Sequence, residues 1–126
     1  MFVDDEEYLV DLVDRMLRHL GYEVVALNSS LEALKCLKSE KQKFDLIIVD
    51  HVMPELSGTE FAKEAKRLQP GIPVILFTGF SDMIPPEKIN EIDIQEVVAK
   101  PVTLDDLAKV VNRLLSSVDV KPSSLC

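Results

Sequence analysis

Residues 44–50 constrain the fold of this chain more than any other stretch. Their sequence is Phe-Asp-Leu-Ile-Ile-Val-Asp, in which the apolar residues follow one another with almost no polar alternation. This pattern is typical of a parallel strand buried on both faces. The strand ends on a charge, Asp50, at the place where open α/β sheets bind their ligands. Met53-Pro54 and Gly58 then break the chain into a loop.

The rest of the chain alternates between short apolar runs and amphipathic patterns. Strands are expected at residues 2–3, 22–27, 44–50, 72–78 and 94–99. Helices are expected at residues 6–20, 30–37, 59–68 and 104–115, together with a short one that begins late because of Pro85-Pro86. Helix starts are marked by a capping box, Ser29-x-x-Glu32, and by Thr103. Strict alternation of this kind predicts a parallel sheet between two helical layers.

Composition narrows the class of protein. The 126 residues, 47% of them hydrophobic, fit one domain, which we place at residues 1–117 with a frayed tail at 118–126. The net charge is −8 and the basic residues are scattered, so no nucleic-acid or membrane surface is indicated. No apolar run has the length of a membrane span, and a cytoplasmic location is expected. Cys36 and Cys126 form neither a disulfide framework nor a zinc site.

Polar side chains follow four of the predicted strands. Asp4 and Asp5 come after the first, Asp50 ends the third, Thr78 ends the fourth and Lys100 follows the fifth. If these strands are parallel neighbours, all of the groups converge on one edge of the sheet. Two carboxylates ~4 Å apart repel by roughly 4 kcal/mol at an effective dielectric constant of about 20, so a cation must compensate.

Hard oxygen ligands without His or Cys favour Mg²⁺ at this edge. A magnesium ion beside carboxylates points in turn to phosphoryl chemistry. A carboxylate can receive a phosphoryl group as nucleophile while the metal, a Lys ammonium and a Thr hydroxyl neutralise charge on the phosphoryl oxygens.

Four motifs together resemble a known family. They are Val-Asp-Asp-Glu at residues 3–6, the D-x-x-M-P-x-x-x-G run at 50–58, Thr78-Gly79 and Lys100-Pro101. In this order and at this spacing they resemble the CheY-like receiver domain of two-component response regulators. The resemblance implies the doubly wound, flavodoxin-like (βα)5 fold, an α/β architecture with strand order 2-1-3-4-5.

The resemblance also implies roles for the site residues. Asp50 would be the phosphoacceptor, taking its phosphoryl group from the phosphohistidine of a histidine kinase or phosphotransfer domain. Thr78 and Lys100 would bind the phosphoryl oxygens, and the Lys100-Pro101 peptide bond would be cis. Mg²⁺, or Mn²⁺ in its place, would be held by Asp4, Asp5, Asp50 and the backbone carbonyl of Val52.

Three features depart from the family pattern. Val97 stands where many members place an aromatic switch residue, three positions before the Lys. Pro85-Pro86 suggests an altered fourth helix, so the usual output and dimerisation surface is not carried over, and a homodimer is left open. Only three residues precede Asp4, fewer than the family's first strand needs, which a native chain continuing upstream would explain.

Several alternatives stay open at this stage. The chain could be a stand-alone receiver or the receiver of a hybrid sensor histidine kinase. A phosphatase of the haloacid-dehalogenase type is disfavoured because Val52 stands where such an enzyme needs an acid, and a phosphate-independent scaffold would be expected to have lost some of the acidic residues. Apolar Val52 and Phe80 predict a long-lived phosphorylated state. His51 and His19 are interpreted as surface or core residues rather than ligands.

Overall fold

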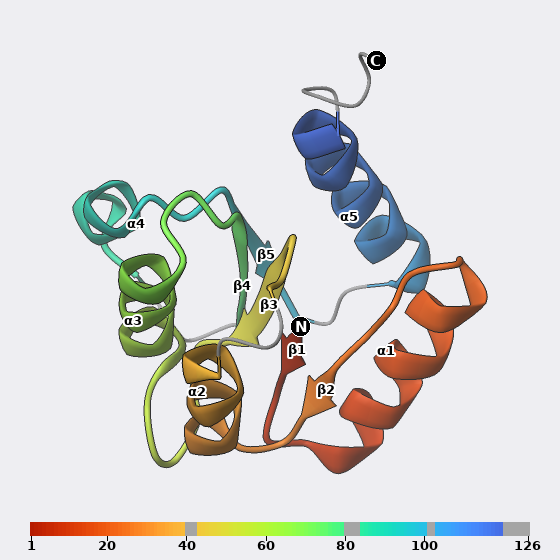
Figure 1. Cartoon of the computed structure of the whole chain (residues 1–126), viewed down its shortest axis with the longest axis horizontal. Coiled ribbons are helices and arrows are strands. Elements are labelled where there is room, and N and C mark those ends of the chain that lie inside the picture. The colour runs from red at the N-terminus through yellow and green to blue at the C-terminus, as the bar shows by residue number, and fades with distance from the viewer. Residues whose placement is uncertain (40–42, 80–83, 101–102, 120–126) are drawn as a thin grey trace.

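A five-stranded parallel sheet with order β2-β1-β3-β4-β5 forms the centre of the protein (Figure 1). The computed structural model describes residues 1–39, 43–79, 84–100 and 103–119. The strands are β1 (Phe2–Val3), β2 (Ala26–Leu27), β3 (Ile47–Asp50), β4 (Val74–Thr78) and β5 (Glu96–Ala99). The helices are α1 (Glu7–His19), α2 (Ser30–Lys38), α3 (Gly58–Leu68), α4 (Pro86–Ile92) and α5 (Leu104–Asp119). The predicted doubly wound fold and strand order are confirmed.

The helices cover both faces of the sheet. Helices α2, α3 and α4 lie on one side, and α1 and α5 lie on the other (Figure 1). Alternate residues of β3 supply the two cores: Ile47 and Val49 pack in the first, and Ile48 packs in the second beside Phe2 and Phe77. Every residue of β3 and β4 is buried, as the continuous apolar runs predict for central strands.

Strand pairing brings the carboxyl ends of the strands to one edge. Val3 pairs in register with Val49, Asp50 with Phe77, and Thr78 with Ala99. Each pair lies at the end of its strand, so the residues that follow β1, β3 and β5 leave the sheet within a few residues of one another. This register, rather than closeness in sequence, assembles the polar residues predicted to meet.

Four strands, β2 to β5, begin later than the sequence predicts, and at three of these starts other groups take the backbone partners. Phe44 donates its N–H to Gln69 Oε1 at 3.3 Å, and its carbonyl accepts from Gln69 Nε2, so regular pairing in β3 begins at Ile47. Val74 N–H donates to Gln95 Oε1 at 2.8 Å. Tyr22 N–H donates to the Leu17 carbonyl of α1, and β2 is only two residues long.

The helices begin at the capping residues that the sequence predicts, and α3 has a further capping box that was not predicted. Ser29 accepts from the Glu32 N–H and Thr103 from the Asp106 N–H, as N-caps do. A complete capping box between Ser57 and Glu60 opens α3, one residue earlier than predicted. Helix α4 is short and begins at Pro86, as expected from Pro85-Pro86.

Some predictions fall outside the described residues. They concern the Lys100-Pro101 peptide bond, Phe80 and the tail beyond residue 119; α5 itself runs two residues past the predicted domain end.

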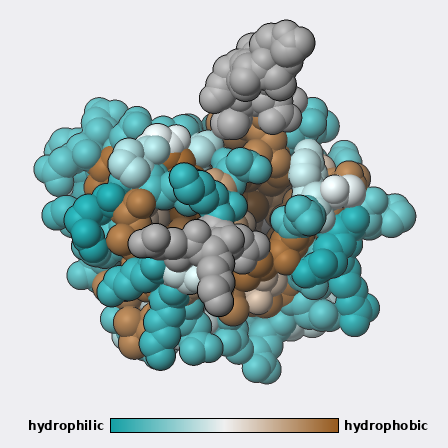
Figure 2. Space-filling view, in the orientation of Figure 1, coloured by the Kyte–Doolittle hydropathy of each residue, from teal (hydrophilic) through white to brown (hydrophobic). Residues whose placement is uncertain are grey.

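Among the described helices, none has the length and apolar composition needed to cross a bilayer. The surface in Figure 2 is mainly hydrophilic, with an apolar strip near its centre. At the amino ends of the strands, Leu17, Tyr22 and Leu46 line a groove of about 500 Å³.

Candidate functional site

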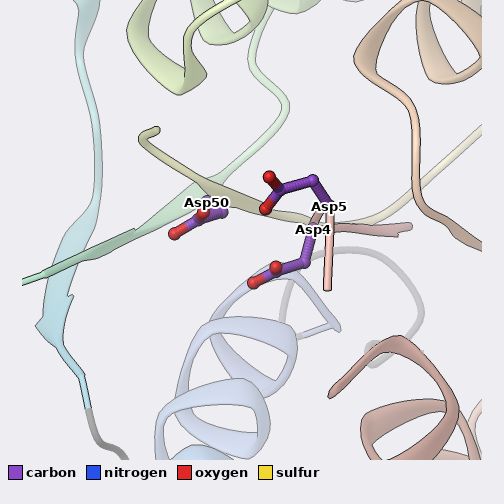
Figure 3. Close-up of side chains that lie close together, drawn as sticks. All are labelled: Asp4, Asp5 and Asp50. Carbon is purple, nitrogen blue, oxygen red and sulfur yellow. The ribbon is translucent and has the colours of Figure 1, made fainter. Parts of the chain in front are cut away.

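Three aspartates cluster at the carboxyl edge of the sheet. Asp4 and Asp5 directly follow β1, and Asp50 is the last residue of the neighbouring strand β3. Figure 3 shows their carboxyl groups turned to the same side, and one oxygen from each lies within 4.8 Å of the others. Asp4 and Asp50 are buried and Asp5 is exposed, so the cluster has one face open to solvent.

The backbone around Asp50 is fixed by its neighbours on β4 and α3. His51 N–H donates to the Phe77 carbonyl at 2.8 Å, and Gly58 N–H donates to the His51 carbonyl at 2.8 Å. A Cβ atom at Gly58 would lie 2.4 Å from the Asp50 carbonyl oxygen, a distance that real Cβ atoms essentially never show. Glycine at position 58 is therefore what allows α3 to start directly against the end of β3.

Lys100 follows the edge strand β5 and reaches the acidic cluster at the same carboxyl edge of the sheet. Its N–H donates to the Thr78 carbonyl at 2.7 Å, which continues the pairing of β4 and β5 by one residue. Its Nζ lies 3.0 Å from Asp4 Oδ2 and 3.1 Å from Asp50 Oδ1. The predicted meeting of the acids and the lysine is thus present, across 96 positions of sequence in the case of Asp4.

Burial and charge shift the protonation of these groups. Loss of hydration raises the pKa of Asp50 from 3.8 to about 6; the negative charges of Asp4 and Asp5 act in the same direction, and the Lys100 ammonium opposes them. Burial likewise raises the pKa of Asp4, against hydrogen bonds from the Glu6 N–H and Lys100. Burial alone would lower the pKa of Lys100, but its hydrogen bonds to Asp4 and Asp50 and their charges raise it.

Comparisons with known proteins identify the family of this chain. The family model of the response regulator receiver domain matches residues 1–112. The chain belongs to this family. A putative two-component response regulator of Arabidopsis thaliana, ARR21, is 32% identical to this chain over 117 residues, which are 93% of its length. The chain spans 19% of that protein's length, and about half or less of several bacterial transcriptional regulators that it matches.

Solved receiver domains have the same fold. A CheY-like response regulator receiver domain protein from Methanospirillum hungatei superposes with a TM-score of 0.87 at 26% identity, covering 96% of this chain and 95% of that one. The signal receiver domain of a signal transduction histidine kinase from Syntrophus aciditrophicus gives 0.79 at 32% identity, covering 97% and 92%. The receiver domain therefore resembles receivers from both kinds of parent protein.

The acidic cluster of the receiver domain fits a hard divalent cation. Its donors are carboxylate oxygens from Asp4, Asp5 and Asp50, close enough to share one ion and partly open to water. Mg²⁺ binds through one or two carboxylates and retains several waters, so this donor set suits it. Val52, the source of the predicted carbonyl ligand, lies two residues after Asp50, and the residue is 56% exposed.

Thr78 is buried at the carboxyl end of β4, one position from the residue paired with Asp50. Its backbone carbonyl accepts from the Lys100 N–H, which ties the strand ends that supply these two residues. The predicted phosphate role of its hydroxyl stays a prediction. Val97, at the position of the missing aromatic, is 37% exposed on the edge strand β5.

One residue near the site was not predicted to belong to it. Glu6, the N-cap of α1, places Oε1 3.5 Å from Lys100 Nζ, and its N–H donates to Asp4 Oδ1 at 3.0 Å. The sequence signal was present, since Glu6 is the third consecutive acid after β1. Sequence alone does not show that this side chain turns toward a lysine 94 residues away.

Proposed function

We propose that this receiver domain accepts a phosphoryl group on Asp50 from the phosphohistidine of a histidine kinase or a phosphotransfer domain. The observation that supports this most directly is the 3.1 Å contact between Lys100 Nζ and Asp50 Oδ1, beside a three-aspartate cluster that fits Mg²⁺. A nucleophilic carboxylate, a fixed cation and a metal site within one small space are what phosphoryl transfer to an aspartate needs.

In the proposed reaction an Asp50 Oδ attacks the phosphorus of the donor. A bond forms between that oxygen and phosphorus while the bond between phosphorus and the donor imidazole nitrogen breaks, and its electron pair stays on the imidazole. The Lys100 ammonium, already 3.1 Å from Asp50, neutralises charge on the phosphoryl oxygens, and the Thr78 hydroxyl donates a hydrogen bond to one of them.

The residues that would hold Mg²⁺ are Asp4, Asp5, Asp50 and the Val52 carbonyl; Mn²⁺ has compatible ligand preferences. When bound, the metal neutralises negative charge on the carboxylates and on the phosphoryl oxygens. Lys100 compensates part of the same charge, because it contacts two of the three aspartates.

Signalling follows from the shift between two conformations that phosphorylation biases. In this proposal the domain acts in the cytoplasm on a downstream partner, without direct contact to nucleic acid or membrane, and a homodimer is one form that the output could take. A stand-alone receiver and the receiver of a hybrid histidine kinase both fit the chain, and the likeness to the Syntrophus aciditrophicus kinase receiver supports the second.

The domain is not proposed to be a turnover enzyme. A phosphatase that uses an aspartate nucleophile in this way needs an acid two residues later, and that position is Val52. The exposed valine cannot orient an attacking water, so we expect the phosphorylated state to be long-lived. Val52→Asn should shorten its half-life by about three- to tenfold, measured as loss of phosphoryl mass with time; an unchanged half-life would contradict this.

The experiment that tests the function is intact-mass analysis after exposure to acetyl phosphate and Mg²⁺. The parent should gain one phosphoryl group and Asp50→Asn none, while Asp45→Asn, at the start of the same apolar run, should behave as the parent. The gain should require Mg²⁺ and be lost after chelation. Equal labelling of parent and Asp50→Asn would refute the assignment of Asp50, and continuous phosphate release from generic phosphate esters would favour the phosphatase.

A further inference from the structure

We propose that Glu6 is a positioning residue that occupies one N–H of the Lys100 ammonium until the phosphoryl group arrives, and so slows phosphorylation of Asp50. The inference rests on the function proposed above. Lys100 Nζ has three carboxylates around it: Asp4 at 3.0 Å, Asp50 at 3.1 Å and Glu6 at 3.5 Å. A lysine ammonium has three N–H donors, so the three contacts use its full donor capacity.

An incoming phosphoryl oxygen competes with these partners for Lys100, and it binds most readily where one of them can leave at low cost. Asp4 cannot leave at low cost, because its side chain is 0% exposed and water cannot replace Lys100 as its partner. Asp50 is the acceptor itself, with a side chain 8% exposed. Glu6 has the longest contact and a side chain 64% exposed, so water can replace Lys100 as its partner.

The backbone of Glu6 is fixed, so its side chain can leave Lys100 without any movement of the helix. Glu6 is the N-cap of α1, and its backbone N–H remains bound to Asp4 Oδ1 whichever way the side chain turns. Release of the carboxylate from Lys100 therefore needs only a side-chain rotation. Until then the carboxylate both competes for the ammonium and repels the approaching phosphoryl dianion, so removing its charge should accelerate transfer.

The test is the rate of phosphorylation by acetyl phosphate at saturating Mg²⁺, followed by quenched intact-mass time courses. Saturation matters because loss of any nearby acid can weaken metal binding. Glu6→Gln should react about two- to fivefold faster than the parent, the range expected for one exposed charge contact. Glu6→Asp keeps the charge and the capping position but is shorter by one methylene, so it should also react faster than the parent.

The matched control is Glu7→Gln, which removes the next acid of the same helix; Glu7 bonds to Asn28 rather than to Lys100. It should react at the parental rate, and all three variants should keep the parental urea midpoint. Structural damage would slow the reaction, so it cannot mimic the expected acceleration.

The outcomes separate this inference from the function on which it rests. If the parent takes up no phosphoryl group at Asp50, the proposed function fails and the role of Glu6 fails with it. If the parent is phosphorylated and Glu6→Gln reacts no faster, only the role of Glu6 is overturned. If Glu6→Gln is faster but Glu6→Asp matches the parent, the negative charge alone acts, and contact with Lys100 is overturned as the mechanism.

Discussion

The acidic half and the cationic half of the site are built on different kinds of strand. Asp50 ends β3, a central strand whose four residues are all buried, and Asp4 follows β1, whose two residues are also buried. Lys100 follows β5, an edge strand whose residues alternate between half-buried and exposed. The acids are thus placed by the cores on both faces of the sheet, whereas the lysine comes from a strand paired on one side only.

This difference suggests a division of labour. The acids must stay close together despite their repulsion, and central strands packed on both faces can hold them there. In the proposed function the lysine binds the carboxylates in one state and a phosphoryl oxygen in the other, which a less buried strand permits. If this is right, substitutions in the central strands should lower the free energy of unfolding more than substitutions in β5.

The largest expected difference is between two residues paired in register, Leu76 on β4 and Val97 on β5. Leu76 is fully buried and Val97 is 37% exposed. Leu76→Ala should lower the free energy of unfolding by about 3 kcal/mol, and Val97→Ala by less than about 1 kcal/mol. Urea unfolding followed by circular dichroism measures both. Equal losses would show that β5 is as firmly packed as the central strands.

Gly58→Ala should disrupt the packing of α3 against the end of β3, next to Asp50. The new Cβ would lie 2.4 Å from the Asp50 carbonyl oxygen and 2.7 Å from His51 Cα, so backbone must shift. We expect a loss of about 2 to 3 kcal/mol in the free energy of unfolding. Gly71→Ala is the control: φ there is +88° with no atom near the new Cβ, so only about 1 kcal/mol of backbone strain is expected. A milder effect at Gly58 than at Gly71 would contradict this account.

Asp50→Asn should stabilise the metal-free protein by about 2 kcal/mol at pH 7.5, because it removes a buried charge from a repulsive cluster. In the folded protein the pKa of Asp50 is raised from 3.8 to about 6. Its protonation therefore stabilises the fold fully below pH 3.8, and that contribution is lost as the pH rises through 6.

The advantage of the Asn variant should accordingly grow between pH 4 and 6.5 and level off above that range. Urea unfolding at several pH values in the presence of a chelator measures it. Asp11→Asn, an exposed acid on α1 paired with Arg15, is the control and should change stability by less than about 0.5 kcal/mol. A pH-independent gain in the Asp50 variant would mean that its carboxyl is not held in a repulsive, dehydrated setting.

The smallest effect is expected from the metal. Mg²⁺ at ten times its dissociation constant should raise the free energy of unfolding by about 1.4 kcal/mol, because the proposed site exists only when the three aspartates are brought together by folding. The same addition should leave Asp5→Asn almost unchanged, because that variant lacks one donor of the cluster. Stabilisation of parent and variant to the same degree would place the ion elsewhere.

The β/α alternation predicted a parallel sheet, and the resemblance to receiver domains implied its strand order. The meeting of Asp4, Asp5, Asp50 and Lys100 followed from their places at the ends of parallel strands, which share one edge of a sheet. The sequence was less successful where side chains replace backbone partners. Nothing in the apolar pattern shows that Gln69 binds both backbone groups of Phe44, or that Gln95 accepts from Val74. The starts of β2, β3, β4 and β5 were all predicted too early.

Contacts between side chains that are far apart in sequence could not be predicted either. Glu6 could be recognised as a helix-terminal acid, but its contact with Lys100 depends on how the ends of β1 and β5 flank β3 and β4 in space. The close approach of Gly58 to Asp50 is likewise a property of packing, although the Ser57-x-x-Glu60 pattern that starts α3 was visible in the sequence.

The three aspartates lie in the first half of the chain and Thr78 and Lys100 in the second, with the turn before β4 between them, and the sheet brings the two halves together. A cut near Gly71 would leave all three acids on one fragment and the hydroxyl and ammonium on the other. Neither piece alone would contain the proposed chemistry. Phosphoryl uptake could then serve as a reporter of fragment complementation, appearing only when the two pieces reassemble.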